Sequence, residues 1–215
     1  RIQDLLRLAG AVGDEVGAKV YAVGGFVRDL LLRHGNLDVD VVVEGDGIAY
    51  AEALARRVAG KVTSHRKFGT AVLTLPDGFK LDVATARTEF YEYPAALPTV
   101  EHSSIRMDLY RRDFTINTLA VCVNPERYGD LLDFFGGQQD LRDKTLRIIH
   151  NLSFVEDPTR ILRAARFEVR LGFRLSRHAE QLTANAVQMG LLEKLAGVRL
   201  STELQLILQE ARPFP

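Results

Sequence analysis

The sequence predicts an α/β domain over about residues 1–145 and an α-helical domain over about residues 146–215. Before residue 145, short β-branched runs alternate with segments of helical periodicity, which is the pattern of a sheet covered by helices. After residue 145, apolar residues recur only at helical spacing. With 47% hydrophobic and 26% charged residues, the 215-residue chain has an ordinary globular composition and can bury a proper core.

The composition excludes several classes of protein. The 28 basic and 28 acidic residues balance, so the chain is not a globally basic nucleic-acid binder, although local basic patches remain open. No apolar stretch approaches the ~20 residues that cross a bilayer, and the first residues lack the pattern of an export signal. The single cysteine, Cys122, allows neither an internal disulfide nor a thiolate zinc cluster. We expect it to be buried in a strand of a cytoplasmic protein.

The expected elements follow from these patterns in chain order. Strands are predicted where β-branched residues cluster, and helices where apolar residues recur every three or four positions. Residues 91–110 contain two prolines and mixed polarity, which predicts a long mobile loop. The predicted strands are residues 19–25, 38–43, 61–75, 79–85 and 118–123, and the predicted helices of the second domain are residues 158–173, 179–196 and 201–211.

Asp38 and Asp40 stand two positions apart in the predicted strand 38–43. Side chains alternate faces along a strand, so both carboxylates point the same way and their Cα atoms lie ~7 Å apart. Like charges this close are costly unless a cation bridges them, and hard oxygen ligands of this kind suit Mg²⁺ and therefore phosphate chemistry. For two such aspartates taken alone, a solvated strand face is the commoner explanation.

The neighbouring glycines offer a different explanation. Gly45 and Gly47 stand between a strand and a helix, as in a dinucleotide-binding turn. That motif needs a third glycine where this chain has Tyr50, whose ring would prevent the close packing of helix against strand. The carboxylates are therefore the better candidates for chemistry.

Two further segments support the carboxylates. Gly24 and Gly25 end one predicted strand and begin a helix, so free backbone N–H groups can face a phosphate, with Arg28 one turn into the helix. Asp82 lies on the polar face of the predicted strand 79–85, where a third metal-site carboxylate and an ordinary exposed aspartate are about equally expected.

Four segments resemble the successive motifs of the class II tRNA nucleotidyltransferase and bacterial poly(A) polymerase family. They are GGFVRD at residues 24–29, LDVDVVV at 37–43, RRDFTINTLAV at 111–121 and EDPTRILRAARF at 156–167. Each motif alone is weak, whereas the ordered set covers nearly the whole chain and is highly specific. The resemblance implies an α/β nucleotidyltransferase head with a mixed sheet, here residues 1–145, and an all-α neck that recognises the base, here residues 146–215. The family's helical body and tail are expected to be absent, as in an excised piece of a longer protein.

The resemblance also implies roles for individual residues. Asp38 and Asp40 match the pair that holds two Mg²⁺ ions, which activate the RNA 3′-hydroxyl and stabilise the leaving pyrophosphate. Asp82 corresponds only loosely to the third catalytic carboxylate. The positions that match nucleotide-binding residues are Gly24, Gly25, Arg28, Arg112, Asp113, Asn117, Asp157, Arg160, Arg163 and Arg166.

The last motif also has a direct physical interpretation. At about 100° per residue, residues 156–170 form an amphipathic helix whose apolar side holds Ile161, Leu162, Ala165 and Val169 and whose other side is ionic. Such charged faces are usually solvated. In the family, the counterparts of Asp157 and Arg160 hydrogen-bond the Watson–Crick edge of the base, with an acceptor and a donor that fit cytosine and adenine. Asp157 can equally be a helix cap with Arg160 as its intrahelical partner.

Three functions remain open at this point. The first is addition of A, or of C and A, from ATP and CTP to the 3′ end of tRNA. The second is a poly(A) polymerase on the same scaffold, and the third is a non-catalytic RNA-binding remnant, which the retained glycines, arginine and aspartate pair disfavour. Without body and tail, we expect nucleotide binding with only weak tRNA binding, because phosphate contacts dominate the affinity for RNA.

Overall fold

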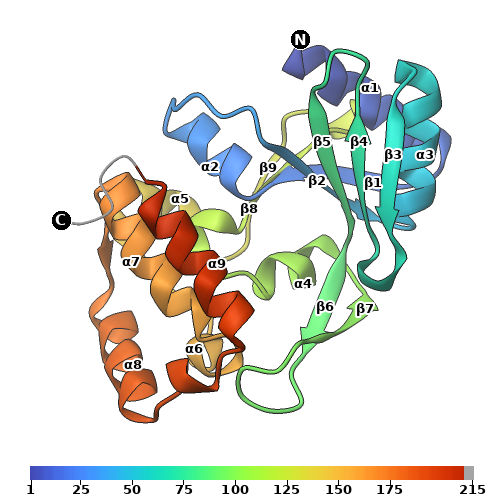
Figure 1. Ribbon diagram of the computed structural model, residues 1–215. Helices are drawn as coiled ribbons and strands as arrows, with labels where there is room; N and C mark the ends of the chain where they lie inside the picture. Colours follow the sequence, from blue (N-terminus) through green and yellow to red (C-terminus); the bar gives the residue numbers. More distant parts are fainter. Residues whose placement is uncertain (211–215) are drawn as a thin grey trace. The chain divides into compact units, whose positions relative to one another are not determined.

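The computed structural model describes residues 1–210, which divide into two compact units, each drawing on separate parts of the chain (Figure 1). The first unit is built on a large sheet, and the second is mainly helical. The first unit contains residues 1–88, 100–111 and 117–134, and the second contains residues 89–99, 112–116 and 135 onward.

The sheet of the first unit has seven strands in the order β3-β4-β5-β2-β1-β8-β9. Among the pairs described, β2 and β5 run parallel and the others run antiparallel, so the predicted mixed sheet is confirmed. The strands are β1 (Lys19–Val23), β2 (Val39–Glu44), β3 (Lys61–His65), β4 (Thr70–Thr74), β5 (Lys80–Thr85), β8 (Leu119–Cys122) and β9 (Leu131–Asp133).

Two helices, α1 (Ile2–Glu15) and α3 (Gly47–Val58), pack side by side on one face of this sheet (Figure 1). Tyr50 of α3 is 1% exposed, and its hydroxyl donates to the carbonyl of Ala9 in α1 at 2.8 Å. The core between helices and sheet is built from the alternate side chains of the strands, among them Val39, Val41, Val43, Leu73, Leu81 and Val83. The strand alternation predicted from the valines is therefore confirmed, although Val42 on the other face is buried as well.

The glycines next to β2 serve the packing of α3. A Cβ at Gly47 would lie 2.8 Å from the backbone nitrogen of Thr85, so only glycine allows the helix to begin this close to β5. Between the glycines, Asp46 caps α3 by accepting hydrogen bonds from the backbone N–H groups of Ile48 and Ala49. Helix capping and close packing therefore account for this segment, in agreement with the exclusion of a dinucleotide turn.

Two predicted elements were wrong in their extent. Residues 61–75 form a hairpin of β3 and β4, because the 3-10 turn Arg66–Phe68 and the left-handed Gly69 reverse the chain in the middle of the run. Residues 91–110 are not a loop throughout. They contain β7 (Thr99–His102), which pairs with β6 (Arg87–Phe90), and the helix α4 (Ile105–Tyr110), which Ser104 caps.

The second unit contains five helices in its described part: α5 (Gly137–Arg142), α6 (Ser153–Glu156), α7 (Thr159–Leu171), α8 (Arg177–Gln188) and α9 (Gly197–Leu208). A short parallel pair of β10 (Thr145–Leu146) and β11 (Arg174–Leu175) departs from the predicted all-α composition. Edge-to-face packing of Phe114 and Phe167, with ring centroids 6.0 Å apart, contributes to the core.

The predicted apolar face of α7 was partly wrong. Ala165 is exposed, whereas Ala164 and Phe167 are buried together with Ile161. Arg160 and Arg166, assigned to the solvated side, are only 4% and 8% exposed. Neither arginine is solvated, because each has a polar partner inside the unit. Across residues 1–210, no helix is both long enough and apolar enough to cross a membrane.

Candidate functional site

Asp40 of β2 and Asp82 of β5 are register partners in the parallel strand pair. Their Cα atoms therefore lie about 4.8 Å apart in neighbouring strands, with both side chains on the same face of the sheet. Asp38 stands two residues before Asp40, directly ahead of β2, and is exposed. The strand register thus brings Asp82 beside the pair that the sequence singles out.

The charges of these carboxylates interact. Asp82 is exposed as a residue, yet its carboxylate is partly desolvated, and this raises its pKa. The negative charge of Asp38 raises the pKa of Asp82 further, while Lys80 lowers it. A cation placed between the carboxylates would relieve this repulsion.

Mg²⁺ usually takes one or two carboxylates and completes its coordination shell with water and substrate phosphates. Within residues 1–210, no group of three or more histidine, cysteine, aspartate or glutamate side chains is arranged to hold a metal by itself. Asp40 and Asp82, with Asp38 beside them, fit the two-carboxylate kind of site. The donor set therefore suits Mg²⁺ that arrives with phosphates.

Gly24 and Gly25 form the turn that leads from β1 into the helix α2 (Gly25–Leu31). Gly24 has φ 68° and ψ −133°, a conformation that side-chain-bearing residues rarely adopt. Its N–H donates to the carbonyl of Leu119 in β8 at 3.1 Å, which anchors the turn to the sheet. The predicted strand, glycine turn and helix are confirmed.

Arg28 is buried rather than pointing into solvent, with 4% of its surface exposed. Its guanidinium donates to both carboxylate oxygens of Asp29, at 2.7 and 2.9 Å, and to the side-chain oxygen of Asn117 at 2.8 Å. Asn36 continues this network, because it donates to Asp29 and accepts from the backbone N–H of Asp38. Arg28 therefore ties the segment before Asp38 to the glycine turn.

In the second unit, Asp113, Arg163 and Arg166 form one ionic network. Arg163 donates twice to Oδ2 of Asp113, at 2.9 and 2.7 Å, and its third nitrogen lies 3.5 Å from Glu203 of α9. Arg166 lies 3.4 Å from the other oxygen of Glu203. Asp113 raises the pKa of Arg163, whereas desolvation lowers the pKa of Arg166. Arg112, beside Asp113, is part-buried.

Asp157 lies in the break between α6 and α7, not inside a helix, so the predicted shared helix face with Arg160 was wrong. Its Oδ1 accepts from the backbone N–H and the hydroxyl of Thr159 and from Arg199 of α9 at 2.7 Å. Oδ2 has no hydrogen-bond partner among residues 1–210. The carboxylate thus caps α7 with one oxygen and keeps the other available.

Arg160 is held from one side by the hydroxyl of Ser153, which accepts from it at 2.7 Å. Its charge lowers the pKa of His150, although desolvation of that imidazole is the larger cause. Desolvation raises the pKa of Glu156, and the charge of Arg160 lowers it in part. Arg160 and Asp157 both influence the pKa of Tyr91, which burial and Glu89 raise. Arg160 is therefore part of a polar cluster that surrounds Asp157.

Four supporting residues were missed in the sequence: Asn36, Ser153, Arg199 and Glu203. Arg199 and Glu203 stand four positions apart on α9 and hold Asp157 and the arginines of α7, respectively. Their helical spacing was visible, but their partners lie far away in the chain. Arg199 also donates to the carbonyl of Ala95, which has φ 65°.

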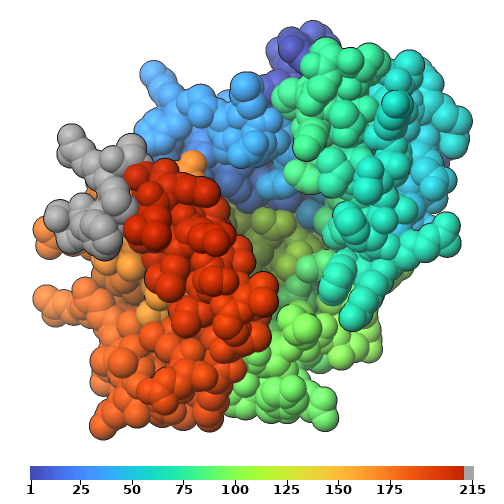
Figure 2. All heavy atoms as spheres, in the orientation of Figure 1, coloured from blue at the N-terminus to red at the C-terminus, as the bar shows by residue number. Residues whose placement is uncertain are grey.

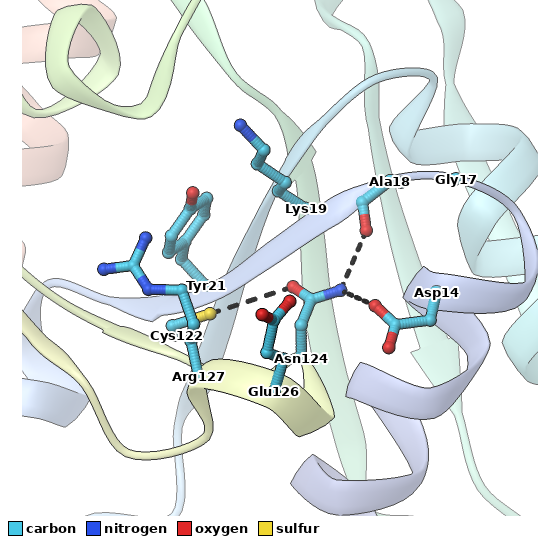
Figure 3. Close-up of a pocket in the computed structure, with 9 residues that line it drawn as sticks. All are labelled: Asp14, Gly17, Ala18, Lys19, Tyr21, Cys122, Asn124, Glu126 and Arg127. Atoms are coloured by element: carbon cyan, nitrogen blue, oxygen red, sulfur yellow. Dashed lines mark hydrogen bonds between the residues drawn. The ribbon is translucent and has the colours of Figure 1, made fainter.

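A separate cavity of about 270 Å³ lies at the end of β1 away from the glycine turn (Figure 3). Asn124 lines this cavity, and its amide nitrogen donates to Asp14 and to the carbonyl of Ala18. Cys122 lines it and is buried, as expected, and burial raises the pKa of its thiol. None of the candidate site residues lines this cavity.

Comparison with known proteins gives concordant matches. Residues 20–147 match the family model described as Poly A polymerase head domain. The chain is 64% identical over 209 residues to a Geobacter sulfurreducens protein named A-adding tRNA nucleotidyltransferase, covering 97% of this chain and 24% of that protein. A solved structure of a CCA-adding enzyme in apo form II is 52% identical, with a TM-score of 0.95, and the match covers 99% of this chain and 50% of that chain.

A solved complex of CCA-adding enzyme with ATP is 51% identical, with a TM-score of 0.88, and the match covers 99% of this chain and 48% of that chain. The chain therefore spans about a quarter of the Geobacter protein and about half of each solved relative.

Proposed function

Because this chain belongs to the Poly A polymerase head domain family, we propose that it is the nucleotide-transferring part of an enzyme that extends the 3′ end of tRNA. The reaction joins a nucleotide from ATP, or from CTP and ATP, to the RNA 3′-hydroxyl and releases pyrophosphate. The pairing of Asp40 with Asp82 in register, beside Asp38, is the observation that carries this proposal. The identity to a relative named as A-adding favours addition of A.

Enzymes of the nucleotidyltransferase family generally use divalent metal ions. Asp38 and Asp40 would hold two Mg²⁺ ions with the help of Asp82, and the bound ions would supply positive charge to the reacting phosphates. The bound ions would also relieve the repulsion from Asp38 that, after desolvation, helps to raise the pKa of Asp82 in their absence. The Gly24–Gly25 turn would leave room for the triphosphate close to the backbone.

We propose that Asp157 and Arg160 select the base of the incoming nucleotide. The available Oδ2 of Asp157 can accept a hydrogen bond from the amino group that both adenine and cytosine carry. Arg160 can donate to the adjacent ring nitrogen. Guanine and uracil present a carbonyl and a ring N–H at the same places, so both contacts would fail.

In this proposal, the catalytic head extends over residues 1–145 and the base-recognising neck over residues 146–215. We propose that the protein works in the cytoplasm, where tRNA is processed.

The test is incorporation by the full-length protein of labelled CTP or ATP into tRNAs that end before the CCA sequence, after CC and after CCA. Addition of A to the CC end alone supports an A-adding enzyme, and stepwise addition of C, C and A supports a CCA-adding one. Repeated addition of A to the complete end would identify a poly(A) polymerase. Failure of all combinations in the presence of Mg²⁺ would overturn the proposed function.

Asp157→Asn tests the base-selecting role. Asparagine keeps the oxygen that accepts from Thr159 and Arg199 but replaces Oδ2 by an NH₂ donor. We expect a small loss of thermal stability, because the amide keeps the hydrogen bond from Arg199 but not the opposite charge. We also expect a loss of ~1–3 kcal/mol in the preference for ATP and CTP over UTP and GTP, and a corresponding fall in the rate with ATP. The measurement compares incorporation of the four nucleotides.

The matched control is Asp46→Asn, which makes the same change at the cap of α3. It should leave both stability and nucleotide preference as they are, because asparagine caps about as well as aspartate. If Asp157→Asn leaves the nucleotide preference unchanged, as Asp46→Asn should, Asp157 only caps α7 and pairs with Arg199.

A further inference from the structure

The sheet face that carries Asp40 and Asp82 continues outward beyond these carboxylates. Asp82 is the register partner of Val72 in β4, and Val72 is the partner of Thr63 in β3. Directly paired residues point to the same face. A row of side chains therefore runs from Asp40 through Asp82 and Val72 to Thr63 at the edge of the sheet.

Two parallel rows flank this one. On one side of it, the strand register pairs Lys80 with Thr74, and Thr74 with Lys61. On the other side, the register pairs Ala84 with Thr70, and Thr70 with His65. We call the face formed by these rows on β3, β4 and β5 the outer sheet face; it carries hydroxyl groups in its middle and basic side chains at Lys61, His65 and Lys80.

No helix described above packs on this face of β3 and β4. Leu73 and Ala71, which point the other way, are buried under α3, whereas Lys61, Thr63, His65 and Lys80 are exposed. Figure 2 shows these strands, coloured teal to green, uncovered on the viewed side. The exposed surface is therefore continuous with the carboxylates of the candidate site.

The charge of this region differs from that of the whole chain. Residues 60–76 contain three lysines or arginines, namely Lys61, Arg66 and Lys67, and no aspartate or glutamate, although acidic and basic residues balance overall. The side chain of Lys67 lies over the ring of Phe68, which is 45% exposed. A basic surface with an exposed aromatic ring suits a nucleic-acid strand, because cations bind phosphates and a ring can stack on a base.

We propose that the outer sheet face binds the single-stranded 3′ segment of the RNA and leads its terminal hydroxyl to Asp40 and Asp82. This inference rests on the proposed function. Lys61 and Lys80 lie two strands apart, about 10 Å between their Cα atoms, so their long side chains can reach different phosphates of one strand. The threonines between them offer hydroxyl groups to the same backbone.

The test is the double variant Lys61→Gln and Lys80→Gln. A short fluorescein-labelled single-stranded RNA that ends in two cytidines is titrated with the protein, and fluorescence anisotropy is followed at several salt concentrations. Since each phosphate contact contributes about 0.7 to the slope of log K against log salt on single strands, we expect a slope smaller by about 1.4. We expect the RNA affinity at low salt to fall at least about tenfold.

The matched control is Arg7→Gln with Arg56→Gln, which removes two exposed cations from α1 and α3 on the opposite face of the sheet. It should change neither the RNA affinity nor the slope by more than a minor amount. If both double variants bind RNA with the wild-type slope, the outer sheet face is not the RNA surface, while incorporation by the wild type still upholds the proposed function. If the wild type neither incorporates nucleotides nor binds RNA, the proposed function and this inference both fail.

Discussion

Replacement of Asp40 by alanine should abolish nucleotide incorporation, with a loss of about a thousandfold or more, while the protein remains folded. Asp40 is half-buried near the start of β2 and is the register partner of Asp82. Its removal takes away one of the three carboxylates proposed to hold the metal ions and also relieves repulsion between like charges. Incorporation of labelled ATP and circular dichroism during heating measure the two effects.

Asp4→Ala is a suitable control, because it removes an exposed carboxylate of α1 far from this strand pair in the sequence. It should preserve both activity and stability. Binding of ATP to Asp40→Ala should persist in part, because the contacts proposed for Asp157 and Arg160 with the base do not involve Asp40. Near wild-type incorporation by Asp40→Ala would refute the assignment of the metal site.

Replacement of Arg28 by methionine should lower the free energy of unfolding by about 3–5 kcal/mol. The change leaves the carboxylate of Asp29 buried without its partner, and it removes a donor from Asn117. Asp29 would no longer be held in place, so Asn36 would lose the acceptor that fixes its side chain. The backbone N–H of Asp38 would then lose its fixed acceptor on Asn36. Urea denaturation followed by fluorescence or circular dichroism gives the free energy.

Arg57→Met is the matched control, because Arg57 also pairs with a carboxylate, Glu15, but both side chains are about half exposed. Exposed pairs contribute about 0–1 kcal/mol, so this variant should lose little stability. Equal losses for Arg28→Met and Arg57→Met would mean that the buried network does not stabilise the glycine turn. Arg28→Lys should fall between them, since it retains the charge but not the two parallel hydrogen bonds to Asp29.

Most strands of the large sheet and the glycine turn could be predicted from the sequence, because β-branched runs and the step from Gly24–Gly25 to α2 are local signals. The pairing of Asp40 with Asp82 could not, since a parallel pair joins strands that are distant in the chain, and the alternation of each strand fixes only its faces. Sequence reasoning therefore placed Asp82 on a polar face without identifying its neighbour.

The arginines of α7 illustrate a different difficulty. The helical spacing of residues 156–170 placed Arg160 and Arg166 on the charged side of the helix, and a charged helix side is expected to face solvent. Both are buried, since Ser153 and Glu203 provide partners that the helix itself does not contain. A buried charge can be predicted only together with its partner, and Glu203 belongs to another helix.

The hydrogen bonds that anchor the glycine turn have a consequence for how the chain folds. Gly24 binds Leu119, and Arg28 binds Asn117, so the turn cannot reach its final conformation until β8 has been synthesised and docked beside β1. Closing such a long loop costs entropy before any contact compensates for it. During synthesis, the β3–β4 hairpin can form early from neighbouring residues, whereas the turn next to the carboxylates is completed among the last parts of its unit.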